Sequence, residues 1–223
     1  YSNPMTANCW AIREAVGIPV TGLCHGTFNV TNQLADFIGA PRSEISATYA
    51  GLNHLTFIYD LRWKGRDAWP LVRARLARDR GQTVDTAHLG QLFPEMGAPS
   101  ESFNSADNPF SWAIFDAYGA YPAVNDRHVS EFFPERFPAG QYCGKTLGVD
   151  VYSLEATTSG GDDRYAAMRA QALGEQPLDE GVFKRTVGEH EQLLSIVASI
   201  RSDSQGVYAA NVPNLRAVPN LPE

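Results

Sequence analysis

Six Phe and Trp side chains crowd into the stretch from Phe110 to Phe137 and surround a short polar segment, Asn125 to His128. Large aromatic side chains stabilise a fold chiefly when they are buried, so this stretch must contribute to a core. We predict that it is helical and partly buried, and that its polar centre is functional. The six aromatic residues are Phe110, Trp112, Phe115, Phe132, Phe133 and Phe137.

The composition supports one substantial core. Of the 223 residues, 43% are hydrophobic and 11% are aromatic, which is too apolar for a disordered chain. One domain is the expectation for such a length, and the sequence gives no sign of a second. The three cysteines, Cys9, Cys24 and Cys143, are odd in number and widely spaced, so we expect free thiols rather than disulfides.

Charge and hydropathy argue against two classes of partner. The formal net charge is -7, and Lys and Arg are scattered, so the chain offers no basic surface to a nucleic acid. It has no apolar run long enough to span a membrane, and Tyr1-Ser2-Asn3-Pro4 does not resemble a signal peptide. We therefore expect a cytoplasmic protein that binds neither nucleic acid nor membrane.

Periodicity and turn residues predict mixed helices and strands. Asn3 and Pro4 form a helix-start signal, and Leu193, Ile196, Val197 and Ile200 share one helical face that we expect to point inward. In chain order we expect a helix ending at Gly17, a strand at 18–23, a helix from Thr27, a strand at 49–63, a helix at 69–80, an irregular insertion at 81–109, a mobile loop at 155–178, a helix at 189–200 and a strand at 207–212.

Cys24 lies where an expected strand meets an expected helix. Backbone N–H groups and the helix dipole at such a position favour the thiolate, which is the form of cysteine that binds metal. The alternative is an inert buried cysteine, because free Cys is among the most buried residue types.

His54 follows Gly51-Leu52-Asn53 at the expected start of a strand. An imidazole there can face a cavity, with Asn53 orienting it. The alternative is a hydrogen-bonded core histidine, and the separation of Cys24 from His54 is not a zinc-finger spacing. Residue chemistry alone leaves the metal site open.

Six motifs, taken together and in order, resemble the family 4 glycoside hydrolases, which depend on NAD and manganese. They run from the first residues to Asn214, and the Cys-His and Asn-His blocks are the most specific. The motifs are Asn3-Pro4-Met5, Gly22-Leu23-Cys24-His25-Gly26, Ala50-Gly51-Leu52-Asn53-His54, Asp126-Arg127-His128-Val129-Ser130-Glu131-Phe132-Phe133-Pro134, Gly188-Glu189-His190 and Asn211-Val212-Pro213-Asn214.

The resemblance implies that Cys24 and His54 hold a divalent metal, usually Mn²⁺, which also contacts the sugar's C2 and C3 hydroxyls. From ligand softness alone a thiolate would suggest zinc or iron instead. The resemblance also implies an oxidation, elimination, addition and reduction sequence, in which NAD oxidises C3 and a base removes the C2 proton. His25 is the expected acid for the glycosidic oxygen, and Asn3 and Asn53 are expected near the substrate.

The base is not fixed by the resemblance, because phosphosugar members carry a tyrosine where this chain has Asp126-Arg127-His128. We take Asp126 as the first candidate, His128 as the second and Tyr121 as a weaker third. The alternative is that this polar segment anchors substrate hydroxyls. Glu189 and His190 are expected to brace the site from a helix.

The resemblance implies an α+β fold, a mixed sheet with packed helices like the C-terminal substrate domain of lactate and malate dehydrogenases. No G-x-G-x-x-G turn occurs, so we expect that NAD is bound mainly by a Rossmann domain outside this chain and that residues 1–223 are the metal- and substrate-binding domain. Alone, the chain should be inactive. Family members form homo-oligomers as full-length enzymes.

Two alternative functions are considered beside the glycosidase. One is a 2-hydroxyacid dehydrogenase, which shares the fold but needs no Cys-His metal motif, and the other is a non-catalytic metal-binding module. Among glycosidase substrates, Cys24-His25-Gly26 resembles members that cleave α-linked uronic acids. A uronate carboxylate needs an anchor, for which Arg127 and the helix start near Thr27 are candidates. Neutral α-galactosides or α-glucosides are the second choice.

Overall fold

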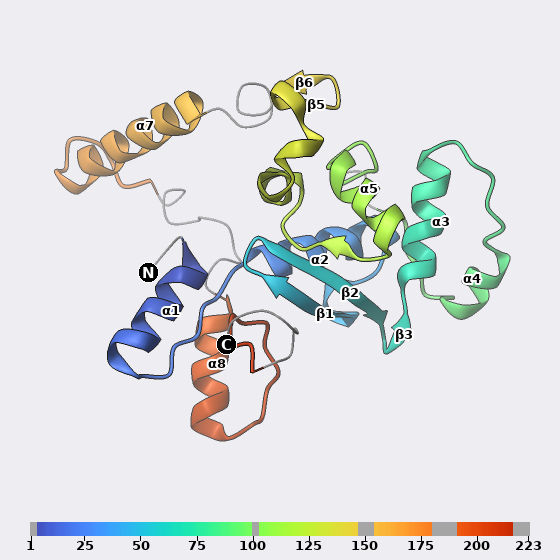
Figure 1. The fold of residues 1–223 in the computed structure, drawn as a ribbon, viewed down its shortest axis with the longest axis horizontal. Helices are drawn as coiled ribbons and strands as arrows, with labels where there is room; N and C mark the ends of the chain where they lie inside the picture. The colour runs from blue at the N-terminus through green and yellow to red at the C-terminus, as the bar shows by residue number, and fades with distance from the viewer. Residues whose placement is uncertain (1–3, 100–102, 147–153, 180–190, 216–223) are drawn as a thin grey trace. The chain divides into compact units, whose positions relative to one another are not determined.

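The computed structural model describes residues 4–99, 103–146, 154–179 and 191–215. The chain forms two compact units, the first comprising Tyr1–Phe132 with Gln192–Glu223 and the second Phe133–Glu191. Figure 1 shows the fold, with helices beside a small sheet. The α+β class predicted from the sequence is confirmed.

The first unit is built on a four-stranded sheet whose pairings are all antiparallel. Strand β2 (Leu55–Trp63) pairs along its length with β1 (Ile45–Leu52). Its other edge pairs with β3 (Arg66–Asp67) and with β4 (Tyr121–Pro122). Because β4 lies far along the sequence, it brings the polar segment after it to the same sheet as His54.

The single strand predicted at 49–63 is wrong, because β1 and β2 are the two arms of a hairpin. Leu52 pairs with Leu55, so Asn53 and His54 form the turn between them. Gly51 has a φ of 131°, and a Cβ there would lie 2.2 Å from the Leu55 carbonyl oxygen. Only glycine accommodates that approach, which explains the Gly in the Ala-Gly-Leu-Asn-His motif.

Three helices enclose the core: α2 (Gly26–Ile38), α3 (Trp69–Asp79) and α5 (Pro109–Tyr118). In Figure 1, α2 passes behind β1 and β2. The Trp112 ring centroid lies 5.0 Å from that of Phe37 and 4.6 Å from that of Tyr121, so an aromatic cluster joins α2, α5 and β4. The predicted burial holds for Trp112, Phe115 and Phe137, whereas Phe132 is exposed.

The predicted strands at 18–23 and 207–212 meet only as one isolated antiparallel bridge between Gly22 and Asn211. The predicted helices are confirmed as α1 (Met5–Val16), α2, α3 and α8 (Glu191–Ser202). The irregular insertion contains a short helix, α4 (Ala87–Leu92).

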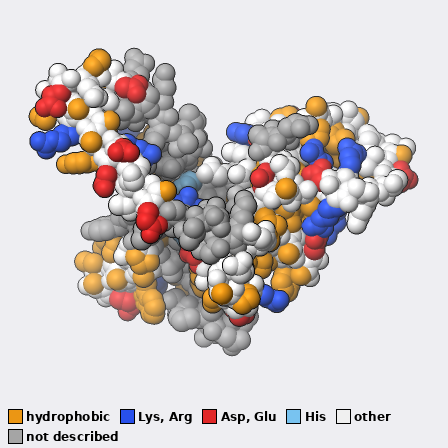
Figure 2. All heavy atoms as spheres, turned by 90° about the horizontal axis from the view of Figure 1, so that it is seen from above, with side chains coloured by type: hydrophobic (Ala, Val, Ile, Leu, Met, Phe, Trp, Pro, Cys, Tyr) orange, Lys and Arg blue, Asp and Glu red, His pale blue; other side chains and the backbone are white. Residues whose placement is uncertain are grey.

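The apolar face of α8 is not buried as predicted. Leu193, Val197 and Ile200 are all exposed, and Trp10 and Val16 of α1 are exposed as well. Figure 2 shows hydrophobic side chains at the surface on the face that it draws. Periodicity identified the helix but could not show whether a neighbouring element covers its apolar stripe.

The second unit contains two short 3₁₀ turns, η3 (Pro134–Arg136) and η4 (Pro138–Gly140). A small hairpin of β5 (Gln141–Tyr142) and β6 (Lys145–Thr146) follows, and then helix α7 (Leu154–Ala172). The predicted mobile loop at 155–178 is wrong, because most of it is α7. Gly and Thr in its first half suggested a loop, whereas alanines in its second half favour helix. Among the described residues, no helix is both long and apolar enough to cross a membrane.

Candidate functional site

The β1–β2 turn presents His54 in a conformation that L-residues rarely adopt. Its φ is 63°, in the left-handed region. Such a backbone costs on the order of 1–3 kcal/mol and persists only where the surroundings enforce it. Here the hairpin register and the close approach at Gly51 enforce it. Strain of this kind clusters at functional sites, so the observed outlier points to a role for His54.

A second strained residue, Asn125, begins the segment that carries His128. Its φ of 60° and ψ of -179° fall in a region that is essentially restricted to glycine. The Asn125 side-chain amide donates a hydrogen bond to Gln33 Oε1 of α2 at 2.8 Å. The Ala123 N–H donates to the Thr56 carbonyl oxygen at 2.8 Å, one residue beyond the start of β2. These two bonds fix the segment against both the helix and the hairpin.

Asp126 is buried, and its carboxylate accepts hydrogen bonds from the N-terminal end of α5. One carboxylate oxygen accepts from the Ser111 N–H at 2.6 Å and from the Ser111 hydroxyl at 2.5 Å, and the other accepts from the Phe110 N–H at 2.8 Å. A carboxylate in this position satisfies helix N–H groups and complements the helix dipole. The role of base proposed for Asp126 stays a prediction, and this geometry favours an anchoring role instead.

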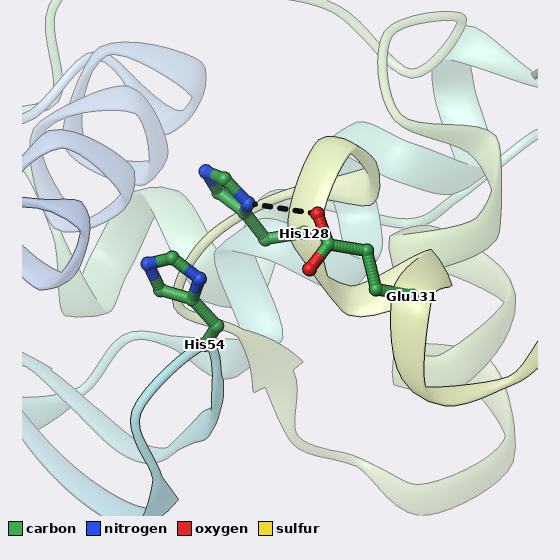
Figure 3. A group of neighbouring side chains, drawn as sticks. All are labelled: His54, His128 and Glu131. Atoms are coloured by element: carbon green, nitrogen blue, oxygen red, sulfur yellow. Dashed lines mark hydrogen bonds and ion pairs between the residues drawn. The ribbon is translucent and has the colours of Figure 1, made fainter. Parts of the chain in front are cut away.

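The side chains of His54, His128 and Glu131 lie close to one another. His128 lies in the short helix α6 (Asp126–Val129), and Glu131 follows in the 3₁₀ turn η2 (Ser130–Phe132). The imidazole rings of His54 and His128 are stacked with centroids 4.0 Å apart and planes 24° apart. Glu131 Oε1 lies 3.3 Å from His128 Nδ1 (Figure 3).

These three side chains each offer one possible metal-ligating atom, and the three atoms lie within 4.8 Å of one another. Burial lowers the pKa of His54, charge on His128 lowers it further, Glu131 opposes the shift and His25 adds slightly to it. These effects favour the neutral form of the His54 imidazole, which keeps a lone pair for a cation.

Cys24 and His25 come directly before α2, and the charge of His25 acts on His54. His25 is the residue before the helix, and the Thr27 hydroxyl donates to the Cys24 carbonyl oxygen at 3.2 Å. A Cβ placed on Gly26 would lie 3.5 Å from Cys24 Sγ and 3.2 Å from the Ala123 carbonyl oxygen. Gly26 thus lies between the Cys24 thiol and the residue that follows β4. Within the described residues, Cys24 is not among the three side chains that form the close group.

The remaining residues predicted for the site differ in their burial and in the elements that carry them. Asn53 is half-buried in the hairpin turn and Arg127 is exposed on α6. Tyr121 is buried in the aromatic cluster against Trp112. Asn3, Glu189 and His190 lie outside the described residues.

Glu131 is the member of the group that sequence reasoning left without a role. It belongs to the Asp126–Pro134 motif, and its position three residues after His128 was a usable signal. Residues three apart in a helical turn lie on the same face.

Comparison with known proteins gives a family match. Residues 49–223 match the model of the family 4 glycosyl hydrolase C-terminal domain. An α-galacturonidase of Bacillus subtilis (strain 168) is 29% identical over 233 residues, covering 100% of this chain and 48% of the relative. An α-glucosidase of Erwinia rhapontici is 26% identical over 243 residues, covering 100% of this chain and 49% of the relative. The chain therefore spans about half the length of these relatives.

Solved structures show the same fold. A 6-phospho-α-glucosidase from gut microorganisms, crystallised with NAD and Mn²⁺, has a TM-score of 0.63 at 16% identity and covers 99% of this chain and 47% of its own. A second 6-phospho-α-glucosidase structure, with NAD and glucose-6-phosphate, has a TM-score of 0.62 at 19% identity and covers 99% and 47%.

Proposed function

Because the chain belongs to family 4 of the glycosyl hydrolases, we propose that it provides the metal- and substrate-binding part of an enzyme that cleaves α-glycosides. The observation that carries the proposal is the hairpin turn that holds His54 in a strained conformation beside His128 and Glu131. The dehydrogenase alternative is set aside, because the relatives are named as glycosidases.

The side chains at this site fit a divalent cation. Two imidazoles and a carboxylate are common metal ligands. Cys24 lies two residues before α2 and adds a thiol that the resemblance assigns to the metal. We propose His54 and Cys24 as ligands of Mn²⁺, with the sugar hydroxyls completing the coordination. Bound NAD would supply the reversible oxidation of the sugar at C3, which makes the C2 proton acidic.

The chain's own residues then have separate tasks. We assign to His25, which is exposed directly before α2, the role of the acid that gives a proton to the leaving glycosidic oxygen. Asn53 orients the His54 ring or contacts a hydroxyl, and Asn3 has the same expected contact near the nicotinamide. Asp126 holds the segment in place through α5. Of the proposed bases, His128 alone has its ring in the close group with His54.

We favour an α-linked uronic acid as substrate. Arg127 is an exposed residue of α6, directly before His128 in the sequence, and a guanidinium is a suitable anchor for a carboxylate. The first turn of α2 contains no Asp or Glu, which leaves its N-terminus suited to a carboxylate. An α-galacturonidase among the relatives, matched over the whole of this chain, supports the same choice.

The test uses the full-length enzyme with NAD⁺, Mn²⁺ and a reductant. It compares p-nitrophenyl α-galacturonide, α-glucuronide, α-galactoside and 6-phospho-α-glucoside. We expect the highest kcat/KM for a uronide. Arg127→Gln should lower kcat/KM for the uronide about tenfold, as loss of a charged hydrogen bond does, and spare the α-galactoside.

Arg136→Gln, an exposed arginine on η3, is the matched control and should change neither rate. Faster turnover of the neutral or phosphorylated sugar would refute the uronate preference and leave the family intact.

A further inference from the structure

We infer that His128 and Glu131 are ligands of the divalent cation together with His54, so that the metal site extends beyond the Cys24–His54 pair. This inference rests on the proposed metal-dependent function. It assigns two residues from α6 and η2 to a site that the sequence motifs placed before α2 and in the β1–β2 hairpin.

The geometry comes first. The three ligand atoms lie within 4.8 Å of one another, which is the separation expected of ligands around one small cation. His54 and His128 come from segments 74 positions apart in sequence (128 minus 54), yet their rings are stacked at 4.0 Å. Figure 3 shows the three side chains as neighbours, with one Glu131 oxygen directed at the His128 ring.

The backbone conformation at two positions indicates that the fold holds the three side chains in place. His54 and Asn125 both have unfavourable conformations, and each one positions a member of the group. Asn125 immediately precedes α6, and its bond to Gln33 ties the turn to α2. A stack of two imidazoles needs no such constraints on both sides, whereas a pre-organised metal site does.

The ligand chemistry also favours the larger set. Mn²⁺ is a hard ion that prefers carboxylate and carbonyl oxygens, and a thiolate with a single imidazole is a poor match for it. Glu131 adds the carboxylate. Two histidines with one carboxylate form a recurring ligand set for divalent ions that leaves positions open for substrate. These three side chains and Cys24 would hold the ion, and the C2 and C3 hydroxyls of the sugar would complete its coordination.

The assignment changes the proposed role of His128. A ring nitrogen that gives its lone pair to a cation cannot take a proton from the substrate at the same time. His128 is therefore a ligand, and the C2 proton goes to a group outside this trio. The contact between Glu131 and His128 is 3.3 Å, long enough that the carboxylate is readily redirected to an ion.

The test measures Mn²⁺ binding rather than activity. Dissociation constants are obtained by titration calorimetry on the full-length protein and on His128→Gln, Glu131→Gln, His54→Gln and Cys24→Ser. We expect His128→Gln and Glu131→Gln each to weaken Mn²⁺ binding about tenfold or more. Removing a residue that only orients a metal ligand already weakens binding by about this factor. His88→Gln on α4 and Glu14→Gln on α1, both exposed, are the matched controls and should bind as the unaltered protein does.

A second measurement uses the unaltered protein and so does not depend on whether a variant folds. Pulsed electron paramagnetic resonance of the Mn²⁺-loaded unaltered protein should show coupling to two imidazole nitrogens, and a single coupled imidazole would overturn the inference. Unchanged affinity in His128→Gln and Glu131→Gln, with weaker binding in His54→Gln and Cys24→Ser, would also overturn it and leave the proposed function standing. Failure of the unaltered protein to bind Mn²⁺ would overturn both.

Discussion

Replacing Asp126 separates its structural role from a catalytic one. The carboxylate is buried and accepts three hydrogen bonds from Phe110 and Ser111 at the start of α5. Asp126→Ala removes the acceptor and leaves these donors without it. A hydrogen bond to a charged group contributes about 1.5–3 kcal/mol. Because the three share one acceptor, we expect a total loss of about 3–5 kcal/mol, less than their simple sum.

The assay combines urea unfolding with activity on the same preparation. Asp126→Asn keeps an acceptor oxygen and the side-chain size, so it should be less destabilising than Asp126→Ala and keep most of its activity below the unfolding transition. Asp60→Asn, which breaks a surface ion pair with Arg62, is the control and should cost less than about 1 kcal/mol. A stable Asp126→Asn enzyme whose kcat falls about 100-fold or more would refute the anchoring role and restore Asp126 as the base.

Three further predictions follow from the fold and the site. Gly51→Ala places a Cβ 2.2 Å from the Leu55 carbonyl oxygen, so it should lower the melting temperature and weaken Mn²⁺ binding, whereas Gly65→Ala, with open space around it, should leave Mn²⁺ binding intact. Trp112→Ala should cost about 3–5 kcal/mol in urea unfolding, and Tyr118→Ala, at 76% exposure, should cost far less. Residues 1–223 alone should not cleave a p-nitrophenyl glycoside with NAD⁺ and Mn²⁺ added, and robust turnover would show that the reaction does not need a nicotinamide held elsewhere.

The buried aromatic residues were the part of the fold that the sequence predicted best. Burial of Trp112 and Phe115 follows from side-chain size alone, and α1, α2, α3 and α8 follow from periodicity and capping residues. The hairpin at 53–54 was missed because Asn-His is not one of the turn pairs that mark hairpins, such as Asn-Gly.

Two features of the site depend on tertiary contacts that no sequence pattern shows. Asp126 is bound by residues on α5 that precede it by 15 and 16 positions, so its role could not be read from its own motif. His54 meets His128 only because β4 pairs with β2 and brings the following turn to the hairpin. The metal role proposed for His54 came from the resemblance, and the partners proposed for it came from the fold.

The fate of the C2 proton tests the central claim most directly. The full-length enzyme is allowed to cleave an α-galacturonide in D₂O with NAD⁺, Mn²⁺ and a reductant, and the released sugar is examined by NMR. If the C2 proton is removed and later replaced from solvent, the product carries deuterium at C2. A product that retains protium at C2 would contradict the oxidation and elimination mechanism, because displacement at C1 by paired carboxylates leaves that position untouched.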